Sequence, residues 1–107
     1  MRKTGLFIKA LDSSRKFKRL FGNSNKQKGL AAGLMVIKKG DSVGIHNTEN
    51  REEILVVLQG KAQVSVAGKR FILKNGMMLY IPPNSLHNVR NTETRLLKYL
   101  YVTAAAV

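Results

Sequence analysis

The sequence predicts an all-β fold, either a closed barrel or a two-sheet jelly roll. About eight short runs of branched and aromatic residues are separated by Gly, Pro and Asn turns, and no strand–helix–strand alternation is present. A set of short strands must protect its edges, and closing the sheet or packing two sheets face to face does so. The 107 residues suffice for one domain with a modest core.

Most of the predicted strands are bounded by turn-forming residues. The run from Leu30 to Ile37 is apolar throughout and is expected to be a buried strand. The segment from Thr103 to Val107 is small and is expected to fray. The remaining strands are expected at 43–48, 52–59, 61–66, 70–73, 77–81, 87–90 and 96–102.

The N-terminal quarter is predicted to differ from the rest of the chain. Residues 5–10 (GLFIKA) form a short apolar run that suits an edge strand. Apolar residues then recur at helical spacing at Phe17, Leu20 and Phe21. Asp12 or Ser13 can cap the start of a helix, and Gly22 can end it, so this segment is predicted to be a short amphipathic helix. We therefore expect residues 1–28 to form an N-terminal arm packed on a barrel of residues 29–107.

Charge is concentrated in this arm. The chain is basic, with a formal net charge of +13, and residues 1–28 carry nine of its 19 Lys and Arg residues against the single acid Asp12. Such an arm can attract nucleic acid, anionic lipid or an acidic protein partner. The alternative is a solvated surface, which we favour because no nucleic-acid-binding motif accompanies the charge. Three apolar anchors on two helical turns would bind a membrane only weakly, so no membrane partner is expected.

A buried carboxylate is predicted in the middle of the chain. In the strand at 52–59, Glu53, Leu55 and Val57 share one face, and Glu52 lies on the other with more apolar residues. Both faces are apolar beyond the glutamates, so we expect the strand to be covered on both sides and one glutamate to point inward. A carboxylate is rarely buried unless it is paired or bound to metal.

Two stretches of the chain resemble the paired motifs of the cupins, a family of small β-barrels. The first motif, G-x5-H-x-H-x(3,4)-E-x6-G, matches in spacing at Gly40, His46, Thr48, Glu53 and Gly60. The second, G-x5-P-x-G-x2-H-x3-N, matches in spacing at Gly76, Pro82, Asn84, His87 and Asn91. Two identities differ, since Thr48 replaces a histidine and Asn84 replaces a glycine. The motifs and the segment between them cover about half of the chain.

The resemblance implies a cupin jelly-roll barrel with a metal site inside it. Carried over position by position, the ligands are His46, Glu53 and His87, with Thr48 in the place of the fourth. Two histidines and one carboxylate suit a divalent transition metal such as Fe, Mn, Ni or Zn and leave coordination positions open. A threonine hydroxyl is a poor ligand, but it can bond a metal-bound water. Glu52 is expected at the surface, paired with Arg51 or a lysine.

The resemblance also implies a pocket for a small organic molecule. Its expected lining consists of Thr48, Leu55, Val57, Tyr80, Tyr99 and Tyr101. Two functions stay open, namely a metal-dependent oxygenase or isomerase and a non-catalytic ligand-binding or sensor domain without metal. Single-domain cupins commonly form homodimers, and residues 5–10 are the segment expected to exchange or pair.

Several functions are excluded by composition. The chain has no cysteine, which rules out thiolate metal sites, disulfides and cysteine nucleophiles. Its longest apolar runs are too short to span a bilayer, and the basic N-terminus lacks the continuous apolar stretch of a secretory signal. We therefore expect a cytoplasmic protein.

Overall fold

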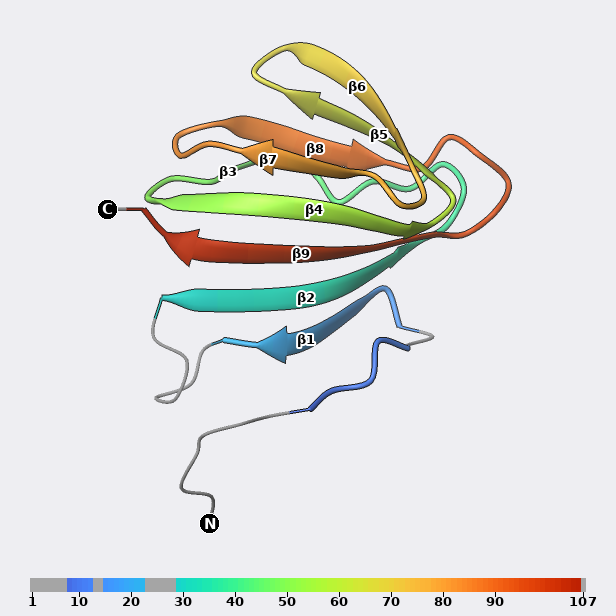
Figure 1. Ribbon diagram of the computed structural model, residues 1–107. Coiled ribbons are helices and arrows are strands. Elements are labelled where there is room, and N and C mark those ends of the chain that lie inside the picture. Colours follow the sequence, from blue (N-terminus) through green and yellow to red (C-terminus); the bar gives the residue numbers. More distant parts are fainter. Residues whose placement is uncertain (1–7, 13–14, 23–28, 107) are drawn as a thin grey trace.

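Two antiparallel sheets make up the fold (Figure 1). The computed structural model describes residues 8–12, 15–22 and 29–106 of the protein. Within these residues it contains nine strands: β1 (Phe17–Phe21), β2 (Leu30–Ile37), β3 (His46–Asn47), β4 (Arg51–Gln59), β5 (Lys61–Val66), β6 (Lys69–Lys74), β7 (Met78–Ile81), β8 (Leu86–Arg90) and β9 (Leu97–Ala105).

The sheets pack face to face, which confirms the predicted all-β jelly roll. The five-stranded sheet has the order β1-β2-β9-β4-β7 and the four-stranded sheet the order β3-β8-β5-β6. Strands of both sheets contribute to one core, because alternate side chains on each strand point between the sheets. The buried members are Met35, Ile37, Leu55, Val57, Ala62, Val64, Leu73, Ile81, Val89, Leu97 and Tyr99.

The predicted helix in the N-terminal segment is wrong. Phe17–Phe21 is strand β1, which pairs antiparallel with β2, so that Phe17 lies opposite Met35 and Lys18 opposite Leu34. A two-turn helix is marginal by itself, whereas the free edge of β2 offers a ladder of backbone hydrogen bonds. Of the predicted edge strand at 5–10, residues 5–7 lie outside the described residues and residues 8–10 are not in a strand.

The C-terminal segment is also more ordered than predicted. Strand β9 extends to Ala105 instead of ending at Val102, and Thr103 pairs with Ala31 of β2 on one side and with Glu53 of β4 on the other. Small side chains carry no strong strand signal, but the ladder needs only the backbone groups. This extension places the Thr103 side chain beside the candidate site.

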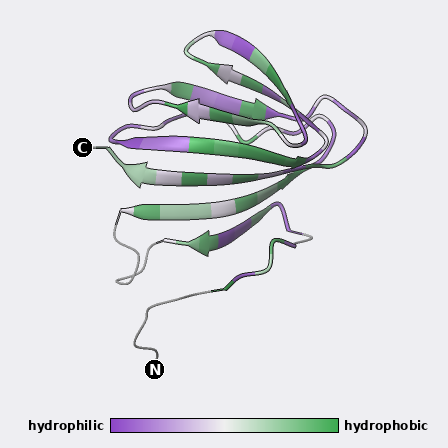
Figure 2. Ribbon diagram, viewed as in Figure 1, coloured by the Kyte–Doolittle hydropathy of each residue, from purple (hydrophilic) through white to green (hydrophobic). Residues whose placement is uncertain are grey.

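The outer face of β4 is exposed, contrary to the expectation that both faces of this strand are covered. Ile54 and Leu58 are 37% and 40% exposed, and Met78 and Tyr80 of the neighbouring β7 are 62% and 54% exposed. Figure 2 shows apolar residues along the strands of the five-stranded sheet, including β4.

The described residues contain no helix long and apolar enough to cross a membrane. Cytoplasmic residence stays a prediction.

Candidate metal centre

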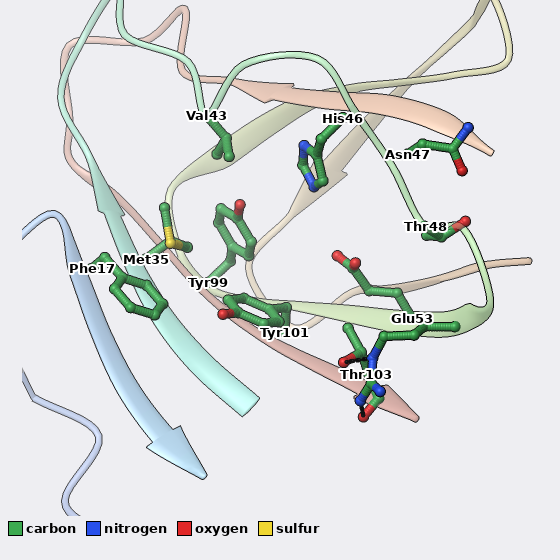
Figure 3. Close-up of a pocket in the computed structure, with 11 residues that line it drawn as sticks. Phe17, Met35, Val43, His46, Asn47, Thr48, Glu53, Tyr99, Tyr101 and Thr103 are labelled. Carbon is green, nitrogen blue, oxygen red and sulfur yellow. Dashed lines mark hydrogen bonds between the residues drawn. The ribbon is translucent and has the colours of Figure 1, made fainter. Parts of the chain in front are cut away.

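The two histidines and Glu53 converge from three strands. His46 on β3 lies directly opposite His87 on β8, and their ring centroids are 3.9 Å apart. Glu53 reaches the same point from β4 in the other sheet, with its Oε1 3.6 Å from Nε2 of His87. Figure 3 shows His46 and the Glu53 carboxylate pointing into one cavity. One potential ligand atom from each residue lies within 4.8 Å of the others.

Strand alternation and one special turn place these side chains. Glu53 precedes the buried Leu55 on the inner face of β4, and His87 precedes the buried Val89 on the inner face of β8. The turn before β8 passes through Asn84, whose φ is +55°. Asparagine tolerates this left-handed conformation better than most residues, so it can stand where the cupin motif has glycine.

Backbone carbonyls orient both imidazoles. Nδ1 of His87 lies 3.1 Å from the Ser85 carbonyl oxygen, and Nδ1 of His46 lies 2.9 Å from that of Gly44. A carbonyl oxygen only accepts, so each Nδ1 donates its proton, and in the neutral imidazole each Nε2 then keeps a free lone pair. Nε2 of His87 is buried and has no hydrogen-bond partner. Such an unsatisfied buried atom is costly and is explained if it binds an ion.

The charge around the site also suits a cation. The Glu53 side chain is only 10% exposed, and among the described residues no lysine or arginine forms an ion pair with it. Burial lowers the pKa of His87, but the Glu53 carboxylate and the Ser85 carbonyl outweigh it and hold this pKa above its ordinary value. The donor set and its burial therefore fit a divalent transition metal, and no described lysine or arginine pairs with Glu53 to take the place of the ion.

Thr48 has a structural contact instead of a free hydroxyl. It is 6% exposed, and its Oγ1 donates to the Pro82 carbonyl at 2.8 Å while accepting from the Ser85 amide at 3.0 Å. The hydroxyl proton is thus committed, and it cannot also be donated to a metal-bound water. Thr48 therefore links the β3–β4 turn by hydrogen bonds to the loop at Pro82 and Ser85. Because the Ser85 carbonyl oxygen accepts from Nδ1 of His87, Thr48 helps to orient His87 indirectly.

A cavity of about 390 Å³ opens beside the three residues. Of the predicted lining, Thr48, Tyr99 and Tyr101 contact this cavity. Leu55 and Val57 lie instead in the core between the sheets. Tyr80 lies on the outer face of β7, where its hydroxyl donates to Oε1 of Glu52 at 2.8 Å. The other lining residues are Phe17, Met35, Val43, His46, Asn47, Arg51, Glu53 and Thr103.

Arg51 is the functional candidate that the sequence analysis missed. Arg51 or a lysine was expected to pair with Glu52. Instead the Arg51 guanidinium donates to Thr103 through Nε (2.9 Å to Oγ1) and Nη2 (3.1 Å to the carbonyl oxygen). Nη2 also donates to the Gly29 carbonyl oxygen at 3.0 Å. Nη1 has no partner among the described residues, and Arg51 lines the cavity. Its position two residues before Glu53 on the same strand was the available signal.

Two phenols complete the polar lining. Burial and the negative charge of Glu53 raise the pKa of Tyr99 far above its ordinary range. Burial also raises the pKa of Tyr101, against an opposing effect of Arg19. Both hydroxyls therefore stay protonated at neutral pH and can donate to a ligand. Tyr101 is held in place by Phe17, whose ring stacks on it at a centroid distance of 6.3 Å.

Comparison with known proteins identifies the family. The model of the cupin domain matches residues 33–103, which include both motifs, and the chain belongs to this family. An uncharacterized protein of Methanocaldococcus jannaschii, MJ1618, is 30% identical over 78 residues. That match covers 71% of this chain and 62% of the relative, so the chain spans less than two thirds of the relative's length.

Solved structures support the same fold. A cupin 2 conserved barrel domain protein from Salinispora arenicola is 26% identical with a TM-score of 0.74, and the match covers 91% of this chain and 81% of that one. A predicted oxalate decarboxylase from Thermotoga maritima is 24% identical with a TM-score of 0.77, covering 83% and 78%. The latter likeness shows the fold alone.

Proposed function

We propose that the protein binds one divalent transition metal through His46, Glu53 and His87 and holds a small organic molecule beside it. The observation that carries this proposal is the buried Nε2 of His87, which has no hydrogen-bond partner and lies near a second imidazole and the Glu53 carboxylate at the wall of the cavity. When bound, Fe, Mn, Ni or Zn would polarise an oxygen atom of the ligand.

The ligand we propose is a small organic acid. Arg51 brings a fixed positive charge to a wall of the cavity, and its Nη1, which bonds no other described residue, can donate to a carboxylate. The two protonated phenols add donors, whereas the apolar part of the wall excludes a strongly polar sugar chain.

Turnover of the bound acid distinguishes the two functions that remain, an enzyme and a sensor. A metal-dependent oxygenase or isomerase would convert the acid, whereas a non-catalytic sensor would only hold it. The second function is favoured by Thr48, which stands where the family has a fourth ligand and whose hydroxyl is committed to Pro82 and Ser85. Product formation from any acid that binds the metal-loaded protein would support the enzyme.

Metal-loaded protein is expected to bind small carboxylic acids in preference to the matching neutral amides. The measurement is the concentration-dependent rise in Tm for a panel of acid–amide pairs, with and without metal. Arg51→Gln should weaken acid binding by about 10-fold or more, because a charge-assisted hydrogen bond is lost. Arg95→Gln, which removes the same charge from an exposed site outside this cavity, is the control.

Equal stabilisation by acids and amides would contradict the carboxylate assignment. So would an Arg51→Gln variant that binds acids as tightly as the wild type does. Because Arg51 also bonds Thr103 and Gly29, its replacement can loosen the strand ends. The metal content of each variant is therefore measured in parallel, and a variant that keeps its metal but loses the acid isolates the ligand contact.

We also propose that the protein forms a homodimer through the outer face of β4 and β7. This face carries exposed apolar side chains at Ile54, Leu58, Met78 and Tyr80, and exposed apolar groups in one patch are typical of interfaces. Ile54 lies directly opposite Tyr80, and Val56 opposite Met78, so the side chains form a continuous patch. A second copy of the chain presents the same patch, as a two-fold interface requires.

Light scattering is expected to give twice the chain mass of 11.9 kDa for the wild type. Met78→Glu should reduce this to the mass of one chain, because a carboxylate on each side of a two-fold interface would be buried without a partner. Ile72→Glu is the matched control, since Ile72 is 54% exposed but lies on the other sheet. A monomeric wild type, or a dimeric Met78→Glu variant, would contradict the proposed interface.

A further inference from the structure

The outer face of the four-stranded sheet carries positive charge that nothing on the sheet balances. Its strands β3, β5, β6 and β8 contain five Lys and Arg residues and no Asp or Glu. Because Ala62 and Val64 of β5 point into the core, the alternate residues of β5 and their partners on β6 and β8 point outward. The outward cations are Lys61, Arg70, Lys74 and Arg90.

A polar hollow of about 260 Å³ lies on this face. Two exposed arginines line it, Arg70 from β6 and Arg90 from β8, and neither guanidinium has an ion pair or hydrogen bond with another described residue. Neutral hydrogen-bonding groups fill the space between them, and these belong to Gln63, Ser65 and Asn88. The hollow therefore presents two guanidinium groups and several neutral hydrogen-bond donors to one ligand.

The arrangement costs folding stability, so it calls for an explanation. Lys61 lies directly opposite Lys74 across the β5–β6 ladder, and like charges in this position are destabilising. Cations on the edge strand β6 can be explained as protection against edge-to-edge pairing. That explanation does not extend to Arg90 on β8 or Lys61 on β5, because both strands lie inside the sheet. A bound anion would remove the repulsion.

We propose that this face binds the phosphodiester backbone of nucleic acid without reading its base sequence. Arginine forks match phosphate oxygens, and several cations spread over one face suit a chain of phosphates better than a single ion. A second hollow, of about 190 Å³, continues the cationic surface with Lys61, Lys74 and Arg95, beside Glu93. No aromatic side chain points outward from β5, β6 or β8, so base stacking contributes nothing.

The test is fluorescence anisotropy with a labelled duplex DNA of about 20 base pairs and a single-stranded RNA of about 20 nucleotides, both of mixed sequence, between about 50 and 200 mM salt. Wild-type protein should bind both probes, the duplex at least as tightly as the single strand. Arg70→Gln/Arg90→Gln should weaken duplex binding by about 10-fold or more at low salt and reduce the slope of log K against log salt by about 1.8.

The matched control is Arg2→Gln/Lys3→Gln, which removes the same charge from the N-terminal arm. Its affinity should stay within about three-fold of the wild type, with an unchanged salt slope. If both double variants lose the same affinity for the probes, binding depends on net charge or on the N-terminal arm, and the proposal is overturned. It would also be overturned if wild-type protein binds neither probe at low salt, or binds only vesicles of anionic lipid. An unchanged circular dichroism spectrum of Arg70→Gln/Arg90→Gln verifies its fold.

Discussion

His87→Ala is expected to lower the affinity of the protein for a divalent transition metal by more than about 100-fold, since even the loss of a group that only orients a ligand costs about 10- to 100-fold. The substitution removes one of two imidazoles from the proposed set of three ligands, and no other described His, Cys, Asp or Glu joins this group. Calorimetric titration of metal-free protein measures the effect, and circular dichroism verifies the fold.

Thr48→Ala is the control for this prediction. It alters the position where the family has a fourth ligand, but the Thr48 hydroxyl faces Pro82 and Ser85. We therefore expect metal affinity to fall by less than about 10-fold, through a looser Ser85 carbonyl behind His87. If Thr48→Ala were as damaging as His87→Ala, the assignment of Thr48 to a structural role would be wrong.

Gly60→Ala is expected to destabilise the fold by about 3 kcal/mol or more. Gly60 joins β4 to β5 with a φ of +86°, and a Cβ there would lie 2.7 Å from the Leu96 carbonyl oxygen. Left-handed backbone costs a residue with a side chain about 1–2 kcal/mol, and a clash with backbone adds to this cost because the strand end must move. Urea denaturation measures the free energy of unfolding.

The matched control for this substitution is Gly68→Ala. Gly68 has nearly the same φ, +83°, but a Cβ there meets nothing within 4 Å. It should therefore cost only the backbone strain of about 1–2 kcal/mol. The difference between the two variants isolates the close approach of β4–β5 to the start of β9. Equal losses of stability would show that this contact relaxes freely.

The arrangement of the site was accessible from sequence through strand alternation together with the resemblance to the cupin motifs. Strand alternation placed Glu53 on one face with Leu55 and Val57, and the resemblance to the first cupin motif chose Glu53 over Glu52 as the inward carboxylate, which the structure buries. The resemblance of the two motifs to those of the cupins implied that His46 and His87 come together, and the structure places them opposite each other on neighbouring strands. The buried strand at 30–37 was predicted with the residue limits that the structure shows.

The features that were missed depend on contacts between distant parts of the chain. Phe17–Phe21 has helical spacing of apolar residues but becomes a strand because β2 has a free edge. Tyr80 was placed in the pocket, yet β7 turns it outward to Glu52. Arg51 reaches Thr103 only because β9 is three residues longer than its apolar pattern indicates. Composition and periodicity do not encode such pairings.

Elemental analysis of untagged protein tests the metal site most directly, because a histidine tag would bind ions itself. After reloading with Fe, Mn, Ni or Zn and removal of free ions, the wild type should retain about one ion per chain, and Glu53→Gln and His87→Ala should retain almost none. A wild type that holds no metal after reloading would contradict the account, and so would an ion content that neither substitution changes.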